Sequence, residues 1–173
     1  EPGMHISPVG LACAGILRHA PELADLLLRP VLLDVFARAL GEGFELELGT
    51  GVVCDASRGF LFWHHHAGGI DEPDLRRKSY PHPSGVERIG CTLYTTPLDD
   101  AFGTLLVHPR RADSPTAPPF EPGRVPWPSA KEVRAPAGSV VLLDQGTWHA
   151  ATPMRRAGHR YFFAFFVRRA GLG

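Results

Sequence analysis

The sequence predicts a mainly β protein, an antiparallel sandwich or barrel with helices near its N-terminus. Short apolar stretches, separated by glycine and proline, follow one another from residue 44 to residue 168. Such stretches favour antiparallel sheets over a parallel α/β sheet. Before residue 44 the apolar residues recur with a helical period instead. Because 173 residues are the length of one ordinary domain, we expect a single domain, with a helical segment over residues 1–43 and a β core over residues 44–168.

Two helices are expected in the N-terminal segment. The first is short and covers residues 21–28, whereas residues 4–19 have no clear pattern. The second starts at Pro30, which suits the first turn of a helix, and its apolar residues keep a 3.6-residue period up to Leu40. Gly41 is then expected to end this helix.

Short segments rich in β-forming residues predict the strands of the core. They cover residues 44–48, 51–54, 60–66, 88–95, 104–107, 132–134, 139–143, 148–151 and 160–168. Residues 113–128 hold six prolines and have neither a helical nor a strand period. We therefore expect a surface loop there, and a loop of this length often borders a functional site.

Charge and composition narrow the function classes. Eighteen basic and eighteen acidic residues cancel, and no long run of one sign argues for nucleic acid or an anionic membrane, so a small molecule is the expected partner. No apolar run approaches the roughly 20 residues of a membrane helix. The cysteines, Cys13, Cys54 and Cys91, are widely spaced, and we expect buried thiols in a reducing, cytoplasmic compartment. Nucleophile-elbow, phosphate-loop and zinc-protease motifs are absent from the sequence.

Histidines predict a metal site. An apolar stretch from Phe60 ends in His64, His65 and His66. Side chains of an extended segment alternate between two faces, so His64 and His66 share one face, from which two imidazoles can bind one metal ion. A third ligand is expected from His149, which follows a glycine turn, an apolar strand and a second tight turn. The alternative is a set of surface histidines at the end of a strand.

Arg160 is the candidate anion ligand. It precedes the very apolar strand over residues 161–167, and an arginine directed into such an interior requires an anion. The planar guanidinium suits a carboxylate. A structural ion pair with Asp144 or Asp99 is the alternative.

The order of several motifs resembles the phytanoyl-CoA dioxygenase family. The motifs are Trp-His-x-x at 63–66, Asp-Asp-Ala-Phe-Gly-Thr-Leu-Leu-Val at 99–107, Ala-Gly-Ser-Val-Val-Leu-Leu-Asp at 137–144, Trp-His at 148–149, and Arg160. The resemblance extends over residues 21–167 and rests on motif order and spacing. It implies a double-stranded β-helix, a jelly roll or cupin-like barrel, and a hydroxylase-type oxygenase that uses iron(II) and 2-oxoglutarate to modify a small molecule.

The resemblance also implies roles for single residues. His64 and His149 fall on the metal histidines of the family, and Arg160 falls on the arginine that binds the C5 carboxylate of 2-oxoglutarate. The carboxylate ligand of the family falls on His66, which is a departure. A three-histidine iron site, a carboxylate supplied by Asp71 or Glu72, and an inactive or specialised site are the three possible outcomes.

Further contacts are expected around this site. Thr92 and Tyr94 share one face of their strand and are candidates for cosubstrate binding, although both are also ordinary strand formers. Trp148 is a candidate wall of the substrate pocket. Arg76, in the run Arg76 to Lys78, is a candidate contact for an acidic substrate, or else part of a solvated surface.

Two rival functions fit parts of the pattern. A cupin-type metal enzyme that does not use 2-oxoglutarate would take His64, His66, Asp71 or Glu72, and His149 as ligands, but it gives Arg160 no role. A non-catalytic relative would bind a small ligand without using iron.

Overall fold

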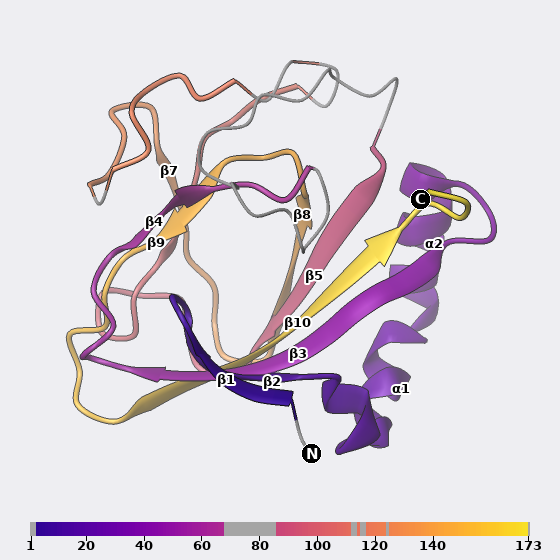
Figure 1. Ribbon diagram of the computed structural model, residues 1–173, viewed down its shortest axis with the longest axis horizontal. Coiled ribbons are helices and arrows are strands. Elements are labelled where there is room, and N and C mark those ends of the chain that lie inside the picture. The colour runs from indigo at the N-terminus through magenta and orange to yellow at the C-terminus, as the bar shows by residue number, and fades with distance from the viewer. Residues whose placement is uncertain (1–2, 68–85, 112–113, 115–116, 124, 173) are drawn as a thin grey trace.

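Two antiparallel sheets face each other in the computed structural model, which describes residues 3–67, 86–111, 114, 117–123 and 125–172 (Figure 1). The larger sheet has the strand order β1-β2-β3-β10-β5-β8 and the smaller one β4-β9-β6-β7. The strands of the larger sheet are β1 (Gly3–Ser7), β2 (Gly10–Ala14), β3 (Glu45–Asp55), β10 (His159–Arg168), β5 (Arg88–Tyr94) and β8 (Ser139–Asp144). Those of the smaller sheet are β4 (Leu61–His64), β9 (His149–Ala151), β6 (Leu105–Val107) and β7 (Lys131–Val133).

From β3 onward the chain passes back and forth between the two sheets. β3, β5, β8 and β10 belong to the larger sheet, whereas β4, β6, β7 and β9 between them belong to the smaller one. This connectivity is that of a jelly roll, so the predicted fold class is confirmed. The strands that follow one another in sequence thereby contribute to opposite walls of one interior.

The helices precede β3 and cover the outer face of the larger sheet (Figure 1). They are the 3-10 turns η1 (Ile16–Arg18) and η2 (Pro21–Leu23), then α1 (Ala24–Leu27) and α2 (Pro30–Leu40). Helix α2 has the predicted bounds: Pro30 lies in its first turn, and Gly41 follows its last residue with φ 86°. The first expected helix is instead a 3-10 turn continued by one α turn.

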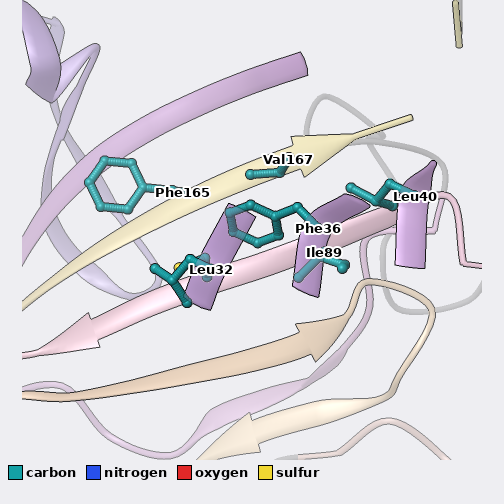
Figure 2. Packing of buried hydrophobic residues seen from close by; sticks show 7 residues of the cluster. Leu32, Phe36, Leu40, Ile89, Phe165 and Val167 are labelled. Carbon is teal, nitrogen blue, oxygen red and sulfur yellow. The ribbon is translucent and has the colours of Figure 1, made fainter. Parts of the chain in front are cut away.

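Helix α2 and the larger sheet enclose the main hydrophobic core (Figure 2). Its buried residues are Leu32, Phe36, Leu40, Ile89, Cys91, Phe165 and Val167. Because side chains alternate along a strand, this packing directs Gly90, Thr92, Ala164 and Phe166 toward the smaller sheet. The helix therefore fixes which face of β5 and β10 is available for a site.

Two expectations for the N-terminal half were wrong. Residues 3–14 form the β1-β2 hairpin, although residues 1–43 were expected to be helical. In this hairpin only Ala12 is buried, and the apolar side chains of Met4 and Ile6 are exposed, so core packing imposes no pattern that would mark a strand here. The strands expected over residues 44–48 and 51–54 are one strand, β3, because Gly49, the glycine between them, does not form a turn. Instead, a ring edge of Phe165 would come within 3.1 Å of a Cβ at Gly49, so this glycine makes room for the aromatic ring.

Other expected features agree with the structure to within a few residues. The described part of residues 113–128 contains neither helix nor strand. Cys54 and Cys91 are buried free thiols, and burial raises the pKa of Cys91 to about 11, whereas Cys13 is only half-buried. Within the described ranges, no helix has the length and hydrophobicity needed to cross a membrane.

Candidate metal centre

Three histidine side chains converge between the two sheets. His64 at the end of β4 pairs in register with His149 at the start of β9, so their side chains lie opposite each other on one face. His66 follows two residues after His64 and lies on the same face. One ligand nitrogen from each residue lies within 4.8 Å of the others. The structure therefore brings together the three histidines that the spacing and the resemblance singled out.

Backbone carbonyls orient two of these rings. His64 Nδ1 lies 2.9 Å from the carbonyl oxygen of Phe62, and His149 Nδ1 lies 2.9 Å from that of Thr147. Because a carbonyl oxygen only accepts, both Nδ1 atoms donate, and the lone pair of each ring is on Nε2. A metal-binding histidine usually has such a partner on its other nitrogen. His66 Nδ1, in contrast, is buried and has no hydrogen-bond partner among the described residues.

Burial keeps the three imidazoles neutral. Desolvation, and then the proximity of the neighbouring histidines, lowers the pKa of His64 and His66 well below the ordinary value. Burial also lowers the pKa of His149 to about 4. A neutral imidazole has a free lone pair, so the cluster is ready to bind a cation at neutral pH.

His65 and Trp148, the neighbours of the clustered histidines along the chain, direct their side chains away from the cluster. His65 is fully buried on the opposite face, where its Nδ1 accepts a hydrogen bond from the backbone N–H of Ala67 at 3.1 Å. Its ring packs edge-on against Trp148, with 4.6 Å between the ring centroids. Trp148 belongs to a core cluster with Trp63 and Trp127 and is not among the residues that line the cavity described next. The expectation that Trp148 forms a wall of the pocket was therefore wrong, because alternation along the chain turns it away when His149 faces inward.

A cavity of about 270 Å³ adjoins the histidine cluster. His64, His66 and His149 line it from one side, and the inner face of the larger sheet forms the other. Thr92 and Tyr94 of β5 are among the lining residues, as expected from their shared face. The middle of the sheet face carries small side chains, which include Ala14, Thr50, Ala164 and Thr92. These small residues leave the space that the cavity occupies.

Arg160 lines the same cavity and has no acidic partner within the described part of the chain. Only 3% of the residue is exposed, and Nη1 donates to the carbonyl oxygen of Phe102 at 3.2 Å. The guanidinium lies over the rings of Tyr94 and Phe162, at 5.1 and 5.5 Å from their centroids. Nε has no hydrogen-bond partner, and no described carboxylate forms an ion pair with Arg160. Burial consequently lowers the pKa of this guanidinium, and it raises the pKa of Tyr94.

Both acidic residues that could have paired with Arg160 have other partners. Asp144 forms an ion pair of 2.7 Å with Arg110, a residue that also donates to the carbonyl oxygen of Ser114. Asp99 accepts hydrogen bonds from the backbone N–H groups of Ala101 and Phe102. The structural alternative for Arg160 is thus not realised with either residue.

Asp71, Glu72 and Arg76 lie outside the described residues. The carboxylate ligand expected as an alternative to His66, and the expected basic contact for a substrate, are therefore not placed.

The proline-rich segment packs against the outer face of β4, the strand that ends in His64. The sequence patterns did not predict this contact. Trp63, next to His64, stacks on Trp127 with 4.2 Å between the centroids and an angle of 7°. Trp63 Nε1 donates to the carbonyl oxygen of Val125 at 2.9 Å. The available sequence signal for this packing was the pair of tryptophans, Trp127 in the proline-rich segment and Trp63 beside His64. This packing holds the outer face of β4 in place.

Gln145 is a further cavity residue that sequence reasoning missed. It is 3% exposed, lines the cavity, and its backbone carbonyl accepts the N–H of His66 at 2.7 Å. A glutamine in a turn after a strand carries no sequence signal of burial, so only the structure could reveal it.

Several solved structures share this fold. HygX from Streptomyces hygroscopicus, with nickel, 2-oxoglutarate and hygromycin B bound, has a TM-score of 0.70 at 16% identity, covering 99% of this chain and 73% of HygX. SnoN, a non-heme alpha ketoglutarate dependent epimerase from nogalamycin biosynthesis, has a TM-score of 0.69 at 13% identity, covering 98% and 68%. EctD from S. alaskensis, with 2-oxoglutarate and 5-hydroxyectoine bound, has a TM-score of 0.64 at 14% identity, covering 91% and 56%.

Sequence comparison adds no assignment. No protein-family model matches the chain, and no curated protein sequence does. What the chain has in common with HygX, SnoN and EctD is thus the jelly-roll fold.

Proposed function

We propose that this protein is a non-haem iron(II)- and 2-oxoglutarate-dependent oxygenase of the hydroxylase type, related to the phytanoyl-CoA dioxygenase family, that acts on a small molecule. One observation carries the proposal: a neutral three-histidine cluster and a buried arginine without a carboxylate partner among the described residues line the same cavity. HygX and EctD, which share the fold, were solved with 2-oxoglutarate bound, and HygX also with the small molecule hygromycin B.

The donor set fits a divalent transition metal. Imidazole suits iron, nickel and zinc, and the oriented Nε2 atoms of His64 and His149 offer two such ligands, with His66 as the third. Bound iron(II) would supply the chemistry with oxygen, while the protein would hold and orient the reactants. With three neutral ligands the protein contributes no negative charge to the ion through this cluster. A dianionic cosubstrate would therefore balance the charge of the ion.

Arg160 and its neighbours fit the distal carboxylate of 2-oxoglutarate. A guanidinium can donate two parallel hydrogen bonds to a carboxylate, and Arg160 Nε is left without a partner in the cavity wall. Tyr94, whose hydroxyl lies beside this guanidinium, is the proposed second contact, and Thr92 lines the space between Tyr94 and Gly90 along β5. The apolar walls around them exclude water, which strengthens these charged hydrogen bonds.

A cupin-type enzyme that does not use 2-oxoglutarate would leave the Arg160 charge without an anion. Burying an unpaired charge is costly, so this alternative explains less of the cavity. A non-catalytic relative would have to bind an anionic ligand without metal.

The test is an anaerobic titration of the metal-free protein with iron(II) and then 2-oxoglutarate, followed by visible absorption. We expect the charge-transfer band of the iron–oxoglutarate chelate in the wild type and no band in His149→Ala. In Arg160→Met we expect a much weaker affinity for 2-oxoglutarate. Iron binding without any affinity for 2-oxoglutarate would exclude the oxygenase and favour the cupin alternative. Absence of iron binding would make the histidine cluster structural and leave the ligand-binding relative.

A further inference from the structure

We propose that the cavity end formed by Gly90 and Gln145 is the substrate subsite, and that Gln145 Oε1 accepts a hydrogen bond from a hydroxyl or N–H group of a neutral, largely apolar substrate. This inference rests on the proposed function, because it assigns the opposite end, at Arg160, to the cosubstrate.

The two ends of the cavity are separated along the strands of the larger sheet. Tyr94 and Gly90 both line the cavity, and four residues of strand correspond to about 13 Å. Tyr94 pairs in register with Phe162 and lies against Arg160, whereas Gly90 pairs with Phe166. The Arg160 end and the Gly90 end are therefore distinct parts of one cavity.

The histidine cluster lies closer to the Gly90 end. The ring of His66 packs against that of Phe166, with 5.4 Å between the centroids, and Phe166 is the register partner of Gly90. A cosubstrate that reaches from Arg160 to the metal thus occupies the part of the cavity along Tyr94 and Thr92. The part beyond the cluster, at Gly90, stays available for a second molecule.

Gln145 presents an unused acceptor at this end. Its backbone is fixed on both sides, because its N–H donates to Arg88 and its carbonyl accepts from His66. Its side chain is buried, and Oε1 has no hydrogen-bond partner among the described residues. A buried acceptor without a partner is unfavourable, so its retention beside a cavity points to a donor on a ligand.

Gly90 makes the position of this amide possible. A Cβ built at Gly90 would overlap Gln145 Nε2. The absence of a side chain at this strand position lets the amide lie against the sheet. Any larger residue at position 90 would displace it.

The surroundings of Gln145 define the class of ligand. Leu48, Leu143 and Phe166 line the cavity on the strands next to Gly90 and are apolar. The described residues that line the cavity include two arginines, Arg58 and Arg160, but no lysine and no acidic residue. Arg58 Nη2 donates to the carbonyl of Thr152, whose hydroxyl bonds Thr104, so its charge lies away from Gly90. Apart from the histidine cluster, the described residues that line this end are apolar or small and include one amide, which fits a neutral molecule with one hydrogen-bonding group.

The experiment compares two probes that differ only in their polar group. Cyclohexanol can donate a hydrogen bond, whereas cyclohexanone can only accept one. Their dissociation constants are measured by saturation-transfer NMR on protein loaded with zinc(II), which is diamagnetic, and 2-oxoglutarate. In the wild type we expect cyclohexanol to bind about 2- to 10-fold more tightly, the contribution of one neutral hydrogen bond. In Gln145→Leu this preference disappears, and in Gly90→Ala it is reduced because the amide is displaced.

The outcomes separate this inference from the proposed function. Equal affinities of the two probes in the wild type, no detectable binding of cyclohexanol, or an unchanged preference in Gln145→Leu would each overturn it. The affinity for 2-oxoglutarate is measured in the same samples. If 2-oxoglutarate does not bind but the preference for cyclohexanol depends on Gln145, the oxygenase proposal falls while the subsite stands as a ligand site.

Discussion

Replacing Arg160 with methionine should change stability and cosubstrate affinity in opposite directions. In the free protein this arginine is a buried cation that donates to the carbonyl oxygen of Phe102, lies over two aromatic rings and has the Tyr94 hydroxyl beside it. Methionine has a similar length and no charge, so it removes the desolvation penalty together with these contacts. A structural arginine would lose stability on the same substitution, which makes the sign of the effect informative.

The magnitudes follow from the contacts. The lost hydrogen bond and two cation–π contacts are worth about 2–3 kcal/mol together, whereas the desolvation penalty removed with a buried, unpaired cation is on the order of several kcal/mol. We expect a free energy of unfolding that is unchanged or higher by up to about 2 kcal/mol, which corresponds to a rise in Tm of about 0–6 °C for a chain of this size. Loss of a hydrogen bond to a charged group costs about 1.5–3 kcal/mol, so affinity for 2-oxoglutarate should fall about 10- to 100-fold.

The assay is thermal unfolding of zinc-loaded protein with and without 2-oxoglutarate. At a concentration 100 times the dissociation constant of the wild type, the ligand stabilises the wild type by about 2.7 kcal/mol, and this shift should fall to about 0.4–1.4 kcal/mol in Arg160→Met. Arg88→Met is the matched control, because Arg88 is also buried but has an ion pair with Glu47 at 3.3 Å. Its loss leaves a carboxylate without that partner and should cost about 3 kcal/mol while the ligand-induced shift persists. An Arg160→Met variant that is strongly destabilised and still responds to 2-oxoglutarate would refute the reasoning.

Three further predictions concern the histidines and the corrected tryptophan. Lowering the pH from 7 to 5 should destabilise the metal-free protein, because histidine in the unfolded chain takes up a proton near pH 6.5, whereas folded His149 has a pKa of about 4 and stays neutral. His149 alone should lower the free energy of unfolding by about 2 kcal/mol at pH 5, which urea unfolding can measure. Equal stability at both pH values would contradict this expectation. The variant His66→Asp should bind iron(II) about tenfold more tightly or better in a competition titration, because it adds a negative charge next to the ion, and weaker binding would show that the site is built for imidazole. Trp148→Phe should lower the free energy of unfolding by about 1–2 kcal/mol without changing the dissociation constant of 2-oxoglutarate, since Trp148 packs away from the cavity, and a changed constant would restore it as a pocket wall.

Local sequence patterns predicted the elements with strong periodicity. Helix α2 was found between Pro30 and Gly41 because its apolar stripe and both end signals are encoded in consecutive residues. The apolar strands were found for the same reason, and their antiparallel order followed from their shortness. The β1-β2 hairpin was missed because it lies at the edge of a sheet, where few side chains are buried and no alternation is required.

The candidate site was predicted only in part. The spacing of His64 and His66 places them on one face of an extended chain, and this local geometry holds in the structure. Trp148 was wrongly expected to line the pocket. It precedes His149 at the start of β9, and because His149 faces the cavity, the side chain of Trp148 faces away from it. The alternative partners of Arg160 could be set aside only when Asp144 was seen with Arg110 and Asp99 with backbone N–H groups.

Local sequence patterns were sufficient to predict the fold class, helix α2, the pair of histidines on one face and an arginine at the head of the last apolar strand. These depend on periodicity and on the cost of burying charge, which act within a few residues of the chain. Three features became visible in the folded chain alone: His149 lies opposite His64, Arg160 shares their cavity, and Gln145 rests on Gly90 with an acceptor that has no partner among the described residues. Those facts depend on strand register between distant segments, and register is set by the packing of the whole sandwich rather than by any single stretch.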